Sequence, residues 1–199
     1  MLKRIVVLVS GGGTNLQALI DAQQRGELGG GEIVCVISSK AGVYALERAA
    51  KAGIASIVLP RKEYADVAAY DRALLAALEQ VQAEVVVLAG FLSILGEQVT
   101  RRYERRILNV HPSLIPAFCG DGFYGLRVHQ AALDYGVKVT GATVHFVNEV
   151  IDGGQIILQK AVEIQPGDTP ELLQKRVMEQ AEWKLLPKAV AMLCSGEIG

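Results

Sequence analysis

Residues 4–25, RIVVLVSGGGTNLQALIDAQQR, contain the pattern that decides the fold. Arg4–Val9 is rich in β-branched apolar residues without polar alternation, which is typical of a strand buried on both faces. Three glycines end this run, and Thr14–Arg25 then carries leucine and isoleucine at helical spacing. A buried strand followed by a tight turn and a helix begins a βαβ unit, so the stretch predicts a parallel sheet covered by helices.

The same alternation continues through the first half of the chain. Further strands are predicted at Glu32–Ile37, Ala55–Leu59 and Glu84–Ala89, and helices at Val43–Ala52 and Val67–Val81. Strands that alternate with helices of this length imply right-handed crossovers between parallel neighbours.

The second half of the chain changes character after a short strand predicted at Ile107–Val110. Residues 111–125 are rich in proline and glycine and predict a long irregular loop, a length that is uncommon unless the loop is functional. A helix is predicted over Arg127–Tyr135. Val139–Val147 and Gln155–Ile164 are longer strands with a turn-like connection, so they predict an antiparallel pair.

The last helix is predicted to begin with Thr169 as its N-cap and Pro170 as its first residue, and Pro187 is expected to end or kink it. Together these elements predict an α/β fold with a single domain over residues 1–199. Its sheet is mostly parallel and twisted, is Rossmann-like in the N-terminal half and is flanked by helices, with an antiparallel strand pair toward the C-terminus.

Composition excludes several classes of function. The 199 residues are 51% hydrophobic with a formal net charge of −1, so the chain can bury a core but offers no excess positive field for nucleic acid or anionic membranes. The basic run 101–106 is therefore interpreted as a solvated helix end. Cys35, Cys119 and Cys194 lack C-x-x-C spacing, which argues against a disulfide framework or a zinc site and favours the cytoplasm. No signal peptide and no membrane span is predicted.

The 21 glycines exceed the average share of about 7%, and several lie in candidate sites. Ser10-Gly11-Gly12-Gly13-Thr14-Asn15 lies between a predicted strand and helix, where backbone N–H groups and the helix N-terminus can bind an anion. The segment lacks the third glycine of a dinucleotide fingerprint and the ending of a P-loop. Two interpretations stay open: a small phosphate site, or an ordinary βα turn with Thr14 as the helix cap.

Polar residues at the ends of later strands form a second group of candidates. Asn109 and His111 are two apart in a predicted strand, so their side chains face one space at its carboxyl end, where open α/β sheets bind ligands. Asp152 precedes two glycines, and by itself this pattern favours a hairpin turn. His145 on a predicted strand either lines a pocket or belongs to the core, and His129 on a predicted helix is interpreted as structural.

Four segments in this order resemble the phosphoribosylglycinamide formyltransferases, a family of folate-dependent formyltransferases: SGGGTNLQ at 10–17, AGFLSIL at 89–95, NVHPSLIP at 109–116 and DGG at 152–154. The resemblance covers nearly the whole chain. It implies transfer of the formyl group of 10-formyltetrahydrofolate to the primary amine of glycinamide ribonucleotide in de novo purine (IMP) biosynthesis. It implies a cytoplasmic monomer or homodimer that acts on these two small molecules, with no metal, no nucleic acid and no membrane.

The resemblance also implies roles for individual residues. Asn109, His111 and Asp152 correspond to a catalytic set in which the amine attacks the formyl carbon directly to give a tetrahedral intermediate. Asn109 would donate to the oxyanion, and His111 would supply positive charge or a proton. Asp152 would raise the pKa of His111 toward the working range.

Binding roles are implied in the same way. Gly13, Thr14 and Asn15 resemble a cradle for the ribonucleotide phosphate, and Glu182 matches an acid that contacts the ribose. The wall of the folate pocket is expected to consist of Leu92, Ser93, Ile94 and Leu95, together with Asn109. His145 is expected to lie close to the catalytic space.

Two features depart from the family pattern. Val67 stands where many members carry a basic residue, so the charged contact to the folate is expected either to be missing or to be supplied elsewhere, by Arg61 or Lys62. The loop 118–125 is longer and richer in glycine than the commoner form, and its substrate contacts stay open.

Three alternatives are considered. Methionyl-tRNA formyltransferases carry an additional C-terminal RNA-binding domain and need a basic surface. Formyltetrahydrofolate deformylases usually carry an extra N-terminal regulatory domain. A non-catalytic binding module on the same fold is disfavoured because it has no need of Asn109, His111 and Asp152 together.

Overall fold

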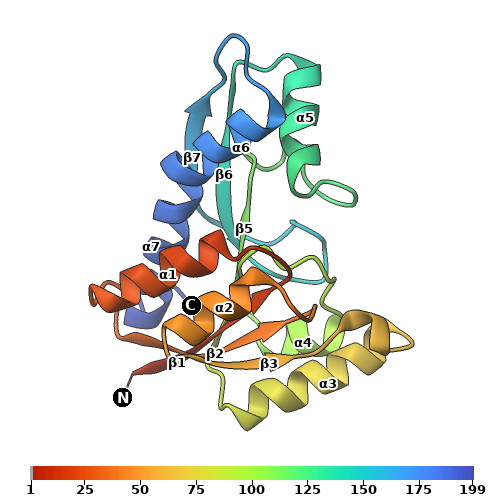
Figure 1. Cartoon of the computed structure of the whole chain (residues 1–199), viewed down its shortest axis with the longest axis vertical. Helices are drawn as coiled ribbons and strands as arrows, with labels where there is room; N and C mark the ends of the chain where they lie inside the picture. Colours follow the sequence, from red (N-terminus) through yellow and green to blue (C-terminus); the bar gives the residue numbers. More distant parts are fainter. Residues whose placement is uncertain (1) are drawn as a thin grey trace.

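The computed structural model describes residues 2–199 and builds them around one continuous sheet (Figure 1). The strands are β1 (Lys3–Val9), β2 (Gly31–Ser38), β3 (Ala55–Val58), β4 (Val85–Leu88), β5 (Ile107–His111), β6 (Val139–Phe146) and β7 (Ile156–Glu163). The helices are α1 (Thr14–Gln24), α2 (Tyr44–Lys51), α3 (Val67–Gln80), α4 (Glu97–Arg102), α5 (Leu126–Tyr135), α6 (Pro170–Val177) and α7 (Trp183–Ser195). A 3-10 turn, η1, covers Arg61–Glu63, and a π-helical turn, η2, covers Met178–Glu182.

The strand order is β3-β2-β1-β4-β5-β6-β7, and the α/β prediction is confirmed. The five strands from β3 to β5 are parallel, whereas β6 is antiparallel to both of its neighbours. The predicted antiparallel pair is therefore β6 and β7, and the β5–β6 contact is a second antiparallel pair. All the predicted strands and helices are present, and α4 is an additional short helix.

Strand β1 shows why its sequence lacks polar alternation. Ile5, Val7 and Val9 belong to the apolar core that α1, α2 and α7 cover, whereas Val6 and Leu8 belong to the core under α3 and α4. All five side chains are fully buried. A strand covered by helices on both faces needs apolar residues at every position.

The chain order reverses between β1 and β4. From β1 the chain runs outward through β2 to β3, and it then returns to place β4 on the other side of β1. Open α/β sheets bind ligands beyond the carboxyl ends of the strands at such a switch point. Here the loops after the two strands meet, because the Ser10 N–H donates to the Gly90 carbonyl at 3.2 Å. The glycine-rich loop therefore lies at the position that topology favours for a ligand.

The end of the chain differs from the prediction at Pro187. Thr169 caps α6 by accepting from the Leu172 N–H, and Pro170 is the first helical residue, as predicted. Pro187, however, lies inside α7, which continues to Ser195, so the expected helix end is wrong. Proline removes one helical hydrogen bond, but η2 already changes the bonding pattern just before α7, and the buried Pro187 ring packs in the core.

The surface of the described residues carries two further findings. Arg101 and Arg102 end α4 and are exposed, and Arg101 forms ion pairs with Glu97 and Glu149, which agrees with a solvated helix end. Within residues 2–199, no helix combines the length and the apolar character that crossing a membrane requires.

Candidate active site

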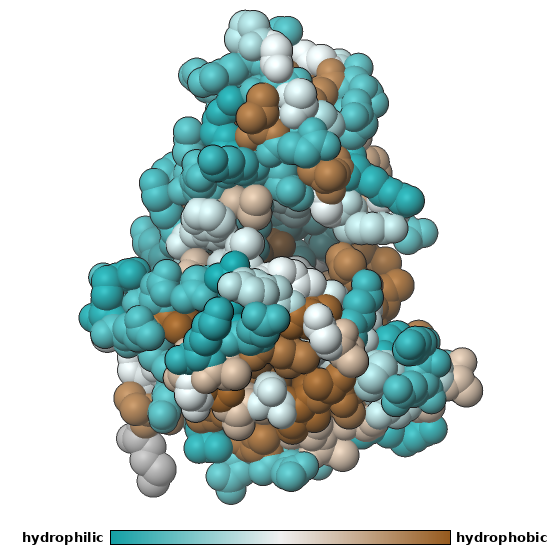
Figure 2. Space-filling view, viewed as in Figure 1, coloured by the Kyte–Doolittle hydropathy of each residue, from teal (hydrophilic) through white to brown (hydrophobic). Residues whose placement is uncertain are grey.

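We call the cavity that Asn109, His111 and Asp152 line the main cavity; its volume is about 540 Å³, which is within the usual range for small-molecule sites. It is lined by the segment after β4, by β5 and the loop that follows it, by the β6–β7 connection, and by parts of α5, α6 and η2. Figure 2 shows the surface hollowed between the part that contains α5 and α6 and the part that contains α1 and α2. The sequence resemblance predicted the residues of this region as the active site.

Strand β5 supplies two of the candidate catalytic residues. Asn109 and His111 both line the main cavity, as their spacing in an extended strand predicts. The antiparallel register places His145 of β6 directly opposite Asn109, and the Asn109 Nδ2 lies 3.2 Å from the His145 Nε2. His145 is almost completely buried and also lines the cavity. It is therefore both a core residue and a pocket-lining residue.

Asp152 lies in a turn and also faces the catalytic strand. The Gly153 N–H donates to the Val150 carbonyl, and Asp152 itself has a positive φ of 53°, so the predicted turn exists. This left-handed conformation is one that aspartate tolerates better than most residues. The Asp152 carboxylate lies 3.5 Å from the His111 Nδ1 and 3.6 Å from the His145 Nε2.

Further donors hold the Asp152 carboxylate in place. The Gly120 N–H donates to its Oδ2 at 2.9 Å, and the Asn109 amide donates to its Oδ1 at 3.5 Å. Burial by itself raises the pKa of Asp152. The contact with His145, the Gly120 N–H and the charges of both histidines lower that pKa and together outweigh burial, so the net pKa lies below its ordinary value. Asp152 is therefore a carboxylate at neutral pH.

Main-chain carbonyls fix the tautomers of the two neighbouring histidines. A carbonyl oxygen only accepts, so the His111 Nε2 donates to the Phe118 carbonyl at 2.9 Å and the His145 Nδ1 donates to the Phe146 carbonyl at 2.8 Å. The His111 Nδ1 is thus the atom that faces Asp152. A proton on Nδ1 makes that contact attractive, whereas neutral His111 would face the carboxylate with a lone pair.

The pKa of His111 corrects one expectation. Burial lowers the pKa of His111 below its ordinary value, and this exceeds the opposite effect of Asp152, which raises it. Asp152 by itself raises the pKa of His111, as expected. The net shift of that pKa is nevertheless downward, opposite to the expectation, because desolvation disfavours the imidazolium. A buried imidazole that gives up its proton readily is suited to donate that proton during a reaction.

The glycine-rich loop differs from an ordinary capped turn. Gly13 is the N-cap of α1, no side chain caps the helix, and the Thr14 hydroxyl donates to the Met178 sulfur at 3.5 Å. The interpretation of Thr14 as the helix cap is therefore wrong. Gly13 has a φ of 72°, and a Cβ at this position would lie 2.7 Å from the Ala45 Cβ. Uncapped N–H groups at this helix end leave donors for an anion.

Asn15 and Glu182 join the loop to the main cavity. Of the three predicted cradle residues, only Asn15 lines the cavity, and its Nδ2 donates to the Glu182 carboxylate at 2.7 Å. Glu182 ends η2 and is buried. Burial raises the pKa of Glu182 to about 7, partly offset by the bond from Asn15. The two residues therefore present a polar pair on the cavity side that α6 and η2 form.

The opposite side of the main cavity is apolar. Leu92, Ser93, Ile94 and Leu95 all line it, and Leu92 and Ile94 keep 53% and 56% of their surface exposed. The Leu92 N–H donates to the Ser10 Oγ at 2.9 Å, which ties this segment to the end of β1. Exposed leucine and isoleucine at a cavity wall can cover a flat aromatic ligand.

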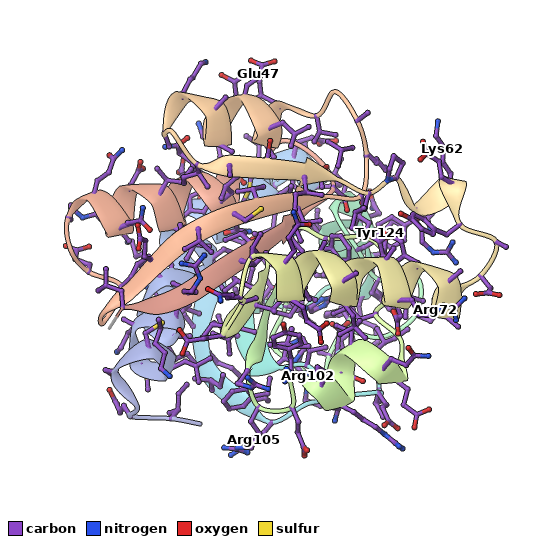
Figure 3. All side chains as sticks on the ribbon, turned by 90° about the horizontal axis from the view of Figure 1, so that it is seen from below. Glu47, Lys62, Arg72, Arg102, Arg105 and Tyr124 are labelled. Carbon is purple, nitrogen blue, oxygen red and sulfur yellow. The ribbon has the colours of Figure 1, made fainter. Side chains whose placement is uncertain are left out.

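A second cavity adjoins this apolar wall. Its volume is about 710 Å³, and Leu92 and Ser93 line both cavities. Its other lining residues include Lys40, Arg61 and Lys62. Figure 3 shows Lys62 pointing away from η1 toward the outside of the molecule. Val67, by contrast, lines neither cavity.

Sequence reasoning missed the main-chain partners in the 118–125 loop. The Phe118 carbonyl and the Gly120 N–H position His111 and Asp152, and a main-chain group leaves no residue signature. Asp121–Gly125 also line the cavity. Cys119 between them has a pKa raised by burial and by Asp152, so its thiol is not activated. All three cysteines are free.

A metal is not needed to explain the donor set. Within the described residues, no three or more His, Cys, Asp or Glu side chains form a group that could hold a metal ion. An amide donor, a buried imidazole and a carboxylate in contact supply instead the parts for stabilising an oxyanion and moving a proton.

A doubly covered α/β sheet with an amide, an imidazole and a carboxylate gathered in one cavity beyond the end of strand β5 is typical of an enzyme active site. The chain belongs to the formyl transferase family, whose model matches residues 3–190. Within that family it is similar to the phosphoribosylglycinamide formyltransferase of Haemophilus influenzae, with 41% identity over 99% of this chain and 90% of the relative.

Other relatives are longer, and solved structures share the fold. The chain is 47% identical over 98% of its length to the trifunctional purine biosynthetic protein adenosine-3 of Bos taurus, but it spans only 19% of that relative. A glycinamide ribonucleotide transformylase from Symbiobacterium toebii has a TM-score of 0.92 at 40% identity, covering 98% of this chain and 89% of its own. A phosphoribosylglycinamide formyltransferase from Bacillus halodurans has a TM-score of 0.90 at 37% identity, covering 98% and 97%.

Proposed function

We propose that the protein transfers the formyl group of 10-formyltetrahydrofolate to the primary amine of glycinamide ribonucleotide, a step of de novo purine (IMP) biosynthesis. The convergence of Asn109, His111 and Asp152 in one cavity is the observation that supports this proposal most. Residues 1–199 act as one formyltransferase domain. The protein works in the cytoplasm as a monomer or homodimer and needs no metal, nucleic acid or membrane.

The reaction proceeds by direct attack. The amine nitrogen forms a bond to the formyl carbon, the formyl oxygen becomes an oxyanion, and the bond between that carbon and the folate nitrogen then breaks. One proton leaves the attacking nitrogen and one reaches the leaving nitrogen, so the reaction neither consumes nor releases protons overall. It requires no oxidant. No covalent enzyme intermediate forms.

Each catalytic residue has a task in this sequence. The Asn109 Nδ2 lies 3.2 Å from the His145 Nε2 and 3.5 Å from the Asp152 Oδ1. The N–H that makes the longer contact with Asp152 is the one that donates to the developing oxyanion. His111 carries the proton on Nδ1 between Asp152 and the reacting atoms. The neutral imidazole accepts the proton of the attacking amine, Asp152 stabilises the imidazolium that forms, and the imidazolium then donates that proton to the leaving folate nitrogen.

The ribonucleotide occupies the polar side of the main cavity. The N–H groups at Gly13 and Thr14 and the Asn15 side chain hold its phosphate at the N-terminus of α1. Glu182 accepts from a ribose hydroxyl while Asn15 steadies its carboxylate. This arrangement directs the amine toward Asn109 and His111.

The folate occupies the apolar side. Its pteridine ring lies against Leu92, Ser93, Ile94 and Leu95, where backbone groups and Asn109 read its polar edge. Its glutamate carboxylates reach the second cavity, where Arg61 and Lys62 provide the charged contact that Val67 lacks.

A coupled assay tests the proposal. We expect purified protein to consume 10-formyltetrahydrofolate only when glycinamide ribonucleotide is present, with formylated ribonucleotide as the product. Consumption with water alone would instead identify a deformylase, and binding of both molecules without turnover would identify a binding module.

A further inference from the structure

All three histidines of the chain line the main cavity. His111 and His145 have tautomers fixed by main-chain carbonyls and lie against Asp152. His129 differs from both. It lies on α5, its side chain is 0% exposed, and neither of its ring nitrogens has a hydrogen-bond partner within the described protein.

A structural explanation does not account for this residue. Buried polar side chains in folded proteins are nearly always hydrogen-bonded, and a histidine that stabilises a core does so through those bonds. Val128 and Ala132, also buried on α5, show that apolar side chains fill this face of the helix. An apolar residue at position 129 would pack there without leaving two polar atoms unpaired.

The electrostatic surroundings keep His129 neutral. Burial lowers its pKa to about 4, and the nearby charge of His111 acts in the same direction. A neutral imidazole has one donor and one acceptor nitrogen, so it suits hydroxyl or amide groups, which also donate and accept. It is poorly suited to a phosphate, which favours charged donors.

His129 lies on the side of the main cavity that is formed by α5, α6 and η2. Helix α5 packs against α6, and both helices lie in the upper part of the molecule in Figure 1. On this side the cavity is lined by Gln174, Met178 and Glu182. The apolar segment Leu92–Leu95 comes from the other part of the sheet, after β4.

We infer that His129 is a ribonucleotide-binding residue that hydrogen-bonds a neutral group, a ribose hydroxyl or the glycinamide amide, of the bound substrate. The inference rests on the proposed function, because that function assigns the ribonucleotide to this half of the cavity. It assigns to His129 a direct contact in place of the structural role that the sequence favoured.

Two variants test the contact. His129→Leu removes both polar atoms and keeps an apolar volume, whereas His129→Gln retains a neutral donor and acceptor. We expect His129→Leu to weaken binding of glycinamide ribonucleotide about tenfold or more, since a buried polar group on the ligand then lacks its partner. His129→Gln should restore most of this affinity. Affinity for 10-formyltetrahydrofolate should stay within about twofold in both variants, as expected for a local change.

Calorimetric titration of each variant with the ribonucleotide alone, followed by thermal unfolding, gives the two readouts. A purely structural role predicts a lower melting temperature with unchanged ribonucleotide affinity, and that result would overturn the inference. If His129→Leu does not fold, His129→Asn provides the same comparison, because its shorter amide cannot reach where glutamine can. Equal affinity in the asparagine and glutamine variants and the wild type would also overturn it.

The wild type separates this inference from the proposed function. If wild-type protein does not bind glycinamide ribonucleotide at all, the proposed function fails. If it binds and formylates the ribonucleotide while His129→Leu binds it equally well, only the role of His129 fails.

Discussion

The Nδ1 atom of His111 lies 3.5 Å from the Oδ2 atom of Asp152, although one residue ends strand β5 and the other lies in the turn between β6 and β7. The contact depends on protonation, because the other ring nitrogen of His111 is committed to a main-chain carbonyl. The geometry thus allows the pair to stabilise a proton that His111 takes up on Nδ1 during the reaction. Several consequences of this and of neighbouring contacts can be measured.

Asp152→Asn removes the carboxylate but preserves the size of the side chain. We expect kcat to fall about 10²–10⁴-fold, because a neutral amide cannot stabilise the imidazolium that forms during the reaction. Binding of the ribonucleotide should persist. Steady-state kinetics with titration calorimetry provide the check, and Asp121→Asn, an exposed acid lining the same cavity, is the matched control. Near-normal turnover of Asp152→Asn would contradict the assigned role.

Gly13→Ala tests the loop before α1. A Cβ here would lie 2.7 Å from the Ala45 Cβ at a φ of 72°, so we expect the free energy of unfolding to fall by about 1–3 kcal/mol. KM for the ribonucleotide should rise, since the phosphate-binding N–H groups shift. Urea unfolding and kinetics measure the two effects.

Two other glycines separate the causes. Gly26→Ala has the same φ but open space around its Cβ, and Gly12→Ala has neither a positive φ nor a neighbour within 4 Å. Stability should therefore decrease in the order Gly12→Ala, Gly26→Ala, Gly13→Ala. A Gly13→Ala variant as stable as Gly26→Ala would show that the contact with Ala45 does not matter.

Glu182→Gln should change how stability depends on pH. The pKa of Glu182 is raised from 4.5 to about 7 in the folded state, so between these values the folded protein holds a proton that the unfolded chain has lost. Stability must then fall as the pH rises through this window, by about 3 kcal/mol in total. The glutamine variant should lose that decline and be more stable than wild type at pH 8.

Urea unfolding between pH 4.5 and pH 8 measures this slope. Glu179→Gln, at an exposed position in the same turn, is the control and should leave the slope unchanged. If Glu182→Gln keeps the wild-type dependence of the free energy of unfolding on pH, a group other than Glu182 is responsible for it.

The double variant Arg61→Ala, Lys62→Ala tests the second cavity. We expect KM for 10-formyltetrahydrofolate to rise about three- to tenfold at low salt, because each charge contact near the protein surface is worth roughly 0.2–1 kcal/mol. The difference from wild type should shrink as ionic strength increases. Lys188→Ala on α7 removes an exposed charge away from both cavities and should have no effect. An equal KM in the double variant and the wild type would show that Arg61 and Lys62 do not contact the folate carboxylates.

Much of this molecule follows from local sequence. Strand β1 is apolar at every position because helices cover both of its faces, and that pattern alone predicts the parallel sheet. Thr169 and Pro170 mark a helix start through chemistry that acts within a few residues. Pro187 does not end α7, because the packing of this buried helix outweighs the loss of one hydrogen bond.

Only part of the candidate site can be predicted from the sequence. The spacing of Asn109 and His111 predicts that they share one side of a strand, and the resemblance adds Asp152. Neither could show that burial lowers the pKa of His111, since desolvation depends on residues distant in the chain. The Phe118 carbonyl and Gly120 N–H that orient the pair belong to the backbone, where any residue supplies the same atoms.

The sequence by itself therefore determined the elements, their order and the residue types of the reaction, because periodicity, caps and glycine conformations are local properties. The tertiary structure decided which of these residues touch. It placed His145 opposite Asn109 through strand register, brought Asn15 to Glu182 on one face of the sheet, and enclosed His129 with no hydrogen-bond partner among the described residues. These contacts join residues far apart in the chain, and only the packing of the whole sheet with its helices fixes their distances and their protonation.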